Sequence, residues 1–218
     1  CGVTLAGSSA TCTIVVEFAP VALGPFADTI DISYNDGAVG QNSTRDIQGT
    51  AGAPANLTID GGPTYDYGTQ ALGSQTANLF TISNSGAVSA TAIADAGGLA
   101  PPYSYVGGAF PGTAGNCTAT LAAAANCTIE VEFQPSGLGV ANDTIDINYN
   151  DGAVATNTTR DVTGTGANPA SLSITETDPY DYGSIAQGAT LNHTFTINNS
   201  GGVAATAIAE VGIAAPFN

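Results

Sequence analysis

Apolar and polar residues alternate along several short stretches of the chain, most clearly in residues 127–133. There Ile129, Val131 and Phe133 share one face, and glutamates lie between them on the other. A period of two is typical of a β-strand with one buried face. Similar stretches, separated by turn residues, cover residues 55–60, 65–68, 78–84, 88–94, 143–149 and 159–164. We therefore expect an all-β fold of seven or eight short strands, arranged as an antiparallel β-sandwich of the immunoglobulin type.

Two interruptions of this pattern have their own predictions. Residues 97–115 are rich in glycine, proline and tyrosine, which favours a long loop. The triplet Asn150-Asp151-Gly152 indicates a tight turn between two strands, because these residues tolerate positive φ.

The whole pattern occurs twice, at the offset of 115 positions that takes Ile30 to Ile145. CTIVVEFAP returns as CTIEVEFQP, DTIDISYNDGAV as DTIDINYNDGAV, and YDYG unchanged. A unit of this length is large enough for its own hydrophobic core. The expected fold class is therefore a tandem array of immunoglobulin-like antiparallel β-sandwich repeats.

The phase of the repeat divides the chain into three parts. Residues 1–53 are expected to be the C-terminal half of a repeat, residues 54–167 a complete repeat, and residues 168–218 the N-terminal half of another. Each half-repeat needs a complement, so the expected partner is another copy, arranged head to tail. The linkers, residues 49–54 and 164–169, are too short for free rotation and predict a semi-rigid rod.

Two kinds of connection satisfy this arrangement. In the first, the repeats form one covalent tandem array, and both ends of the present sequence lie in one flexible loop of the repeat. In the second, separate subunits join by half-domain (strand) complementation. We favour the covalent array, because a single loop then accounts for both ends.

The charge of the chain excludes several classes of partner. Two basic residues stand against eighteen acidic ones, and the formal net charge is −16. Nucleic acid and anionic membrane surfaces both require clustered cations, so neither is an expected partner. No apolar run approaches the roughly 20 residues that span a bilayer, and we expect no membrane insertion. Without an initiator methionine or a leader, the sequence reads as a stretch of a longer, acidic, secreted product.

The four cysteines form two close pairs, Cys1 with Cys12 and Cys117 with Cys127, each just before a predicted strand. We expect two disulfides within repeats, hence an oxidising compartment and an extracellular or cell-surface location. A zinc site is the weaker interpretation, because C-x-x-C spacing and histidine partners are lacking.

The motifs CTIxVxFxPxxxG, DTIxIxYNDG and the closing GTG resemble the choice-of-anchor D repeats of bacterial surface proteins. These are related to the abnormal-spindle and hydin domains and to the major sperm protein. The resemblance covers the whole repeat, including YDYG and the paired cysteines. It implies an immunoglobulin-like fold and a spacer role in exported proteins.

Candidates for catalysis are few. The single histidine, His193, has Asn78 as its counterpart in the preceding repeat, and we expect it to be an outward strand residue. No Ser-His-Asp set can be built around it from a recognisable motif. We therefore predict that the chain is not an enzyme.

Calcium is the one cofactor for which the sequence offers ligands. Asp146, Asn148, Asn150 and Asp151 bring several oxygen ligands into a short stretch. Their spacing does not match an EF-hand, so we favour a solvated acidic face and predict no cofactor, with calcium as the alternative. Arg45 and its counterpart Arg160 are expected to serve as local counter-charges to this acidic surface.

Acceptor sequons for N-glycosylation are frequent. The asparagines are Asn42, Asn56, Asn116, Asn126, Asn142, Asn157, Asn192 and Asn198. Only Asn42 and Asn157 form a recurring pair, and we treat all eight as candidates.

The expected function is that of a structural repeat unit of an extracellular fibre, stalk or filament. The alternative is adhesion, in which a binding module recognises a glycan or a host surface through tyrosines such as Tyr65, Tyr67, Tyr103 and Tyr105. Because Tyr65 and Tyr67 recur with the fold, packing is the simpler account of them.

Overall fold

The computed structural model describes residues 1–217, and within them it contains β-strands and no helix. The central part, residues 54–167, forms two sheets. One sheet has the order β3-β5-β9-β7, and the other has the order β4-β11-β10-β6-β8. The strands of the first are β3 (Leu57–Ile59), β5 (Thr76–Asn84), β7 (Tyr103–Tyr105) and β9 (Asn126–Phe133). Those of the second are β4 (Thr64–Ala71), β6 (Ala90–Asp95), β8 (Thr120–Leu121), β10 (Gly139–Asn150) and β11 (Ala155–Ala167).

Neighbouring strands are antiparallel except for β4 and β11, which pair in parallel. The two sheets enclose one apolar core, so this part of the chain is an immunoglobulin-like β-sandwich. The all-β, immunoglobulin-like expectation is confirmed.

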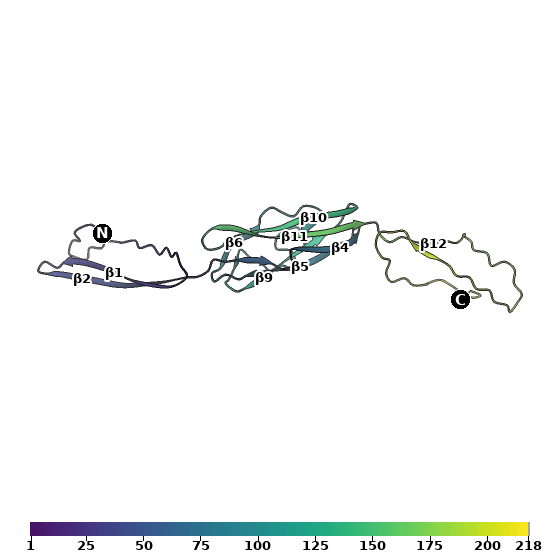
Figure 1. Cartoon of the computed structure of the whole chain (residues 1–218), viewed down its shortest axis with the longest axis horizontal. Helices are drawn as coiled ribbons and strands as arrows, with labels where there is room; N and C mark the ends of the chain where they lie inside the picture. Colours follow the sequence, from purple (N-terminus) through teal and green to yellow (C-terminus); the bar gives the residue numbers. More distant parts are fainter. Residues whose placement is uncertain (218) are drawn as a thin grey trace.

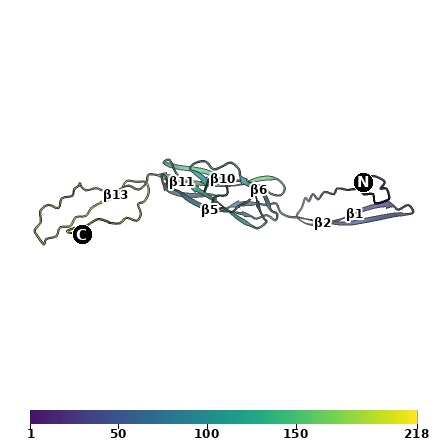
Figure 2. The ribbon, with the colours of Figure 1, turned by 180° about the vertical axis from the view of Figure 1, so that it is seen from behind.

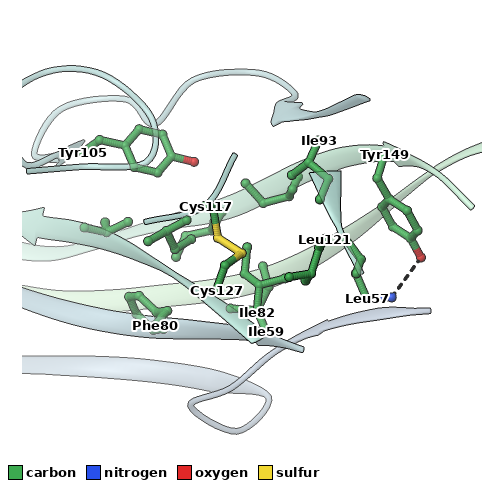
Figure 3. Close-up of a cluster of buried hydrophobic side chains, with 14 of the residues drawn as sticks. Leu57, Ile59, Phe80, Ile82, Ile93, Tyr105, Cys117, Leu121, Cys127 and Tyr149 are labelled. Carbon is green, nitrogen blue, oxygen red and sulfur yellow. Dashed lines mark hydrogen bonds between the residues drawn. A yellow bond between two sulfur atoms is a disulfide. The ribbon is translucent and has the colours of Figure 1, made fainter. Parts of the chain in front are cut away.

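The core consists of the apolar residues that alternate along the strands. Ile129, Val131 and Phe133 of β9 are completely buried, as are Ile145 and Ile147 of β10. Figure 3 shows Phe80 and Ile82 from β5, and Leu57 and Ile59 from β3, gathered near the Cys117–Cys127 disulfide. The alternating faces predicted from the sequence therefore point inward as expected.

Two smaller sheets flank the sandwich. On one side lies the hairpin of β1 (Gly24–Asn35) and β2 (Gly40–Ala51), and on the other lie β12 (Leu172–Ile174) and β13 (Ile197–Asn199). Figures 1 and 2 show the three parts in a row, with the N-terminal hairpin and β12–β13 at opposite ends. Long strands such as β10 and β11 run along the rod.

The structure corrects three expectations. The predicted loop of residues 97–115 contains the short strand β7, because its two tyrosines pack into the core. Residues 55–60 and 65–68, expected as one opening strand broken by glycines, contribute to two strands in different sheets, β3 and β4, divided by a turn at Gly61 and Gly62, which both adopt positive φ. The linkers are shorter than predicted, since β11 continues to Ala167 by pairing with β4, and β2 continues to Ala51.

No helix within residues 1–217 has the length and hydropathy needed to cross a membrane. Asn218, the last residue of the expected C-terminal half-repeat, lies outside the described residues.

Candidate functional site

The N-terminal segment, residues 1–53, exposes the apolar face that the central sandwich buries. Phe18 is 52% exposed and its counterpart Phe133 is 0% exposed; for Ile32 and Ile147 the values are 46% and 0%. Residues 11–18, the counterpart of β9, form no strand. The N-terminal segment therefore exposes apolar side chains whose counterparts belong to the core of the central sandwich.

The C-terminal segment, residues 168–217, is open in the same way. Ile197 is 56% exposed, against 0% for its counterpart Ile82, and Phe195 is 41% exposed, against 0% for Phe80. Of the counterparts of β3, β4, β5 and β6, only the first and a part of the third form strands here, as β12 and β13. The apolar residues exposed at the two ends of the chain are thus counterparts of residues that the central sandwich buries.

Local structure is nevertheless the same in both copies. Thr29 donates to the Asp46 carboxylate at 2.8 Å, as Thr144 does to Asp161. At the other end, the Asn199 side chain accepts from the backbone N–H of Ser171 and donates to the carbonyl of Val203. Asn84 makes the corresponding contacts in the central domain. The N-terminal and C-terminal segments therefore share the local hydrogen bonds of the central domain and differ from it in their long-range contacts.

Several side-chain hydrogen bonds join the N-terminal half of the central sandwich, residues 54–103, to its C-terminal half, among them those of Tyr149, Tyr67 and Arg160. The Tyr149 hydroxyl accepts from the backbone N–H of Leu57 at 3.2 Å (Figure 3). The Tyr67 hydroxyl donates to the Val131 carbonyl at 2.8 Å.

A third bond of this kind corrects the expected role of Arg160. Arg160 on β11 donates from its guanidinium to the carbonyl of Ile59 on β3, in the opposite sheet. Rather than serving as a counter-charge to surface acids, it connects the two sheets. Local sequence gives no signal for this contact, because its partner lies 101 residues away.

The junctions between parts are closely packed. A Cβ on Gly52 would lie 3.2 Å from that of Ala87, and one on Gly202 would lie 2.9 Å from that of Ala167. The turn that follows β5, or β13, therefore lies directly against the preceding linker at both junctions. Such packing limits bending between consecutive parts.

Both expected disulfides are present, Cys1–Cys12 and Cys117–Cys127, each with a Cα–Cα distance of 4.9 Å. Cys117 and Cys127 are buried at the edge of the core. A disulfide forms in an oxidising compartment, which agrees with that part of the localisation expected from the sequence.

The calcium candidates have protein partners of their own. The Asp151 carboxylate accepts from the backbone N–H groups of Ala153 and Val154, and these bonds lower its pKa. Asn150 accepts from the N–H of Gly152 and Asp146 from the Asn157 side chain. Asn148 lies beside them on β10, without a side-chain hydrogen bond among those described. Within residues 1–217, no three His, Cys, Asp or Glu side chains gather as a metal site would require.

His193 lies on the open C-terminal segment. Its ring stacks on that of Tyr180 with centroids 4.0 Å apart, and its Nδ1 lies 2.9 Å from the Tyr180 hydroxyl. Phe195 meets the imidazole edge to face. The histidine thus belongs to an aromatic cluster.

All eight sequon asparagines are exposed: Asn42, Asn56, Asn116, Asn126, Asn142, Asn157, Asn192 and Asn198. The recurring pair forms matching cross-strand hydrogen bonds, from Asn42 to Asp31 and from Asn157 to Asp146. Both members lie on the outer face of their hairpins.

The tyrosines proposed for adhesion belong largely to the core. Tyr67, Tyr103 and Tyr105 are 5%, 1% and 5% exposed, and Tyr65 is half-buried. Burial, followed by the nearby Asp143 and Asp66, raises the pKa of Tyr103 to about 12. Burial likewise raises the pKa of Tyr67 and of Tyr105. Tyr65, Tyr67 and Tyr103 pack against one another and Tyr105 packs against Phe110, so the three buried rings offer no stacking surface to a sugar.

No family model matches the chain, and none of the curated proteins matches it. Solved structures similar to it include the VesB protease of Vibrio cholerae, at 18% identity and a TM-score of 0.40, over 50% of this chain and 31% of the protease chain. A second is the ASH/PapD-like domain 7 of human CEP192, at 12% identity and a TM-score of 0.39, over 53% of this chain and 88% of that domain. A protein of unknown function from Porphyromonas gingivalis W83 is 13% identical, with a TM-score of 0.37, over 66% and 67% of the two chains. This chain thus spans about a third of VesB.

Proposed function

We propose that the chain is a structural repeat unit of an extracellular fibre, stalk or filament, in which repeats join end to end. One observation carries the proposal. The apolar residues exposed at both ends of the rod are counterparts of residues buried in the central sandwich. Exposed apolar surface of this extent marks an interaction site in a soluble protein.

The proposal divides the chain as the repeat does. Residues 1–53 and 168–218 are half-repeats, and residues 54–167 are a complete repeat. The packed junctions at Gly52 and Gly202 support a rod in which successive repeats hold a fixed orientation. A fibre needs this stiffness along its axis.

The chemistry of the surface supports an extracellular place. The two disulfides need an oxidising compartment, and the charge of −16 keeps a long assembly soluble through mutual repulsion. We assign the repeats to the choice-of-anchor D type of bacterial surface proteins, on the motifs that resemble that family. The proposed role is mechanical and includes no catalytic step.

Immunogold electron microscopy tests the proposal. Antibodies raised against the chain should label filaments outside the cell in rows, and the label should vanish from cells that lack the gene. Label confined to the cell interior, or dispersed without filaments, would refute a fibre.

The mass of isolated filaments distinguishes the two kinds of connection. On a denaturing, reducing gel, a band near 21.4 kDa indicates separate subunits. Material that stays far larger after boiling and reduction indicates a covalent array.

A further inference from the structure

We propose that the N-terminal segment (residues 1–53) of one copy of this chain binds the C-terminal segment (residues 168–217) of a second copy. The two segments together would form one sandwich in the register of the central domain. This inference rests on the proposed function and names the partner of its open ends. It concerns the second kind of connection, between separate copies, which the sequence alone does not favour.

The first argument is strand pairing. In the central domain, β9 lies between β5 and β7, and its register with β5 places Phe80 opposite Ile129. The counterparts of these two residues are Phe195 and Ile14, which lie at opposite ends of the chain. Residues 11–18 have the sequence of a central strand but lack the neighbour that β5 provides in the complete repeat. A second copy's residues 191–198 supply that neighbour.

The second argument is the fit of the two cores. Phe133 closes over Gly164, where an added Cβ would lie 2.7 Å from the ring, and in the hairpin Phe18 closes over Gly49 in the same way. In the central domain, Phe133 also packs against Tyr67 at a centroid distance of 5.8 Å. The counterpart of Tyr67 is Tyr182, in the C-terminal segment. Phe18 is thus already placed to receive it.

The third argument is the set of hydrogen bonds between halves. The bond from Arg160 to Ile59 has Arg45 and Ile174 as its counterparts. The bonds of Tyr149 with Leu57, and of Tyr67 with Val131, would recur as Tyr34 with Leu172 and Tyr182 with Val16. In each pair one residue belongs to the N-terminal segment and the other to the C-terminal segment.

Within one copy the two segments do not meet, because they lie at opposite ends of the rod with the complete sandwich between them (Figures 1 and 2), and a second copy supplies the partner segment. The surfaces that meet are different from one another, so the interface is heterologous. Heterologous interfaces on a straight rod extend into an open filament.

Cysteine trapping in the full chain tests the register. Leu79 pairs with Glu130 across β5 and β9, and the counterparts are Thr194 and Val15. Paired strand residues have Cα atoms about 4.5 to 5.5 Å apart, within the reach of a disulfide. The variant with Val15→Cys and Thr194→Cys should form a ladder of multimers on a non-reducing gel, which reduction collapses.

The matched control carries Val15→Cys and Thr206→Cys. The counterpart of Thr206 is Thr91 on β6, which belongs to the sheet opposite β9. This variant should form no ladder. Equal ladders from both variants, or none from either, would overturn the proposal.

A second measurement uses no engineered cysteine. Phe18→Ala should raise the concentration at half-assembly, measured by sedimentation, by at least about tenfold, because it removes a ring that the complete repeat buries. Leu23→Ala should leave that concentration unchanged, because its counterpart Leu138 is 65% exposed in the complete repeat. Equal effects of the two variants would contradict the proposed fit.

The two proposals fail in different ways. If antibodies label extracellular filaments but the purified chain neither cross-links in register nor responds to Phe18→Ala, the fibre function stands and association between copies is refuted. If antibodies label no extracellular filaments, the fibre function itself fails.

Discussion

A single residue type shows how context decides burial in this chain. Phe133 is completely buried and stacks on Tyr103 at a centroid distance of 4.9 Å, while Phe18, in nearly the same local sequence, is half exposed. The difference lies in the partner strands, which are present around Phe133 only. Stability of the central domain should therefore depend on such residues, and stability of the ends should depend on association.

Phe133→Ala should lower the free energy of unfolding of the central domain by about 3 to 5 kcal/mol, since it leaves a cavity under Gly164. Urea unfolding followed by near-ultraviolet circular dichroism of tyrosine measures the change. Leu138→Ala, at a 65% exposed position, should change the free energy by less than about 0.5 kcal/mol. A similar small change for both variants would show that the ring is not part of a packed core.

Alkaline pH should destabilise the sandwich through its buried tyrosines. The folded state raises the pKa of Tyr103 from 10.0 to about 12, so it favours the neutral phenol. The stability that this provides is complete below pH 10 and is lost as pH rises toward 12. In Tyr103→Phe, the melting temperature should fall less steeply across that interval. Parallel curves for the two proteins would exclude this role for Tyr103.

Among the elements, strands with strict alternation could be predicted from sequence, and short strands could not. The pattern of residues 127–133 is sufficient to place β9. By contrast, β7 is three residues long and β8 two, and they form only because neighbouring strands pair with them. Glu132 shows the same limit. The alternation predicts that its side chain points outward, yet it is 8% exposed because Gln75 and Ser104 hydrogen-bond to it from adjacent segments.

Only a part of the candidate site could likewise be predicted from the sequence. The open faces of the two ends follow from the phase of the repeat, so residues such as Ile32 and Ile197 could be identified from sequence. The role of Arg160 could not, because its acceptor is a backbone carbonyl on a distant strand. Contacts that depend on packing of two sheets leave no local pattern.

The Cys117–Cys127 disulfide should stabilise the central domain by limiting the unfolded chain. For a sequence separation of 10, replacing both cysteines with alanine should cost about 3 kcal/mol. Urea unfolding under oxidising conditions measures the loss. A reductant should not lower the free energy of unfolding of the double variant through this site. In the unmodified domain, reduction of the disulfide should lower the free energy of unfolding by about as much as the double substitution does. No difference between the two oxidised proteins would refute a stabilising role.

The acidic hairpin turn should be independent of calcium. The Asp151 carboxylate is already bonded to two backbone N–H groups, and Asp146 is bonded to Asn157. EDTA, or added calcium, should therefore leave the melting temperature of the purified chain unchanged at constant ionic strength. Matched additions of magnesium chloride control for screening. A rise in melting temperature with calcium but not with magnesium would show that these carboxylates bind calcium.

At the scale of the whole molecule, the chain is a rod with one complete sandwich and an open half at each end (Figure 1). Its negative charge disfavours side-by-side contact between rods, while the apolar faces favour contact at the ends. Growth along one axis is the expected result. The packed linkers limit bending, and in the proposed filament they would keep successive repeats in a fixed relative orientation.

Electron microscopy of isolated extracellular filaments tests the central claim most directly, through their axial repeat. The twelve-residue strand β10 runs along the rod and spans about 40 Å, and a short linker follows each sandwich. The account predicts thin filaments with an axial repeat of about 40 to 50 Å, decorated by antibodies to this chain. Compact particles without an axial repeat, or filaments that the antibodies do not bind, would contradict it.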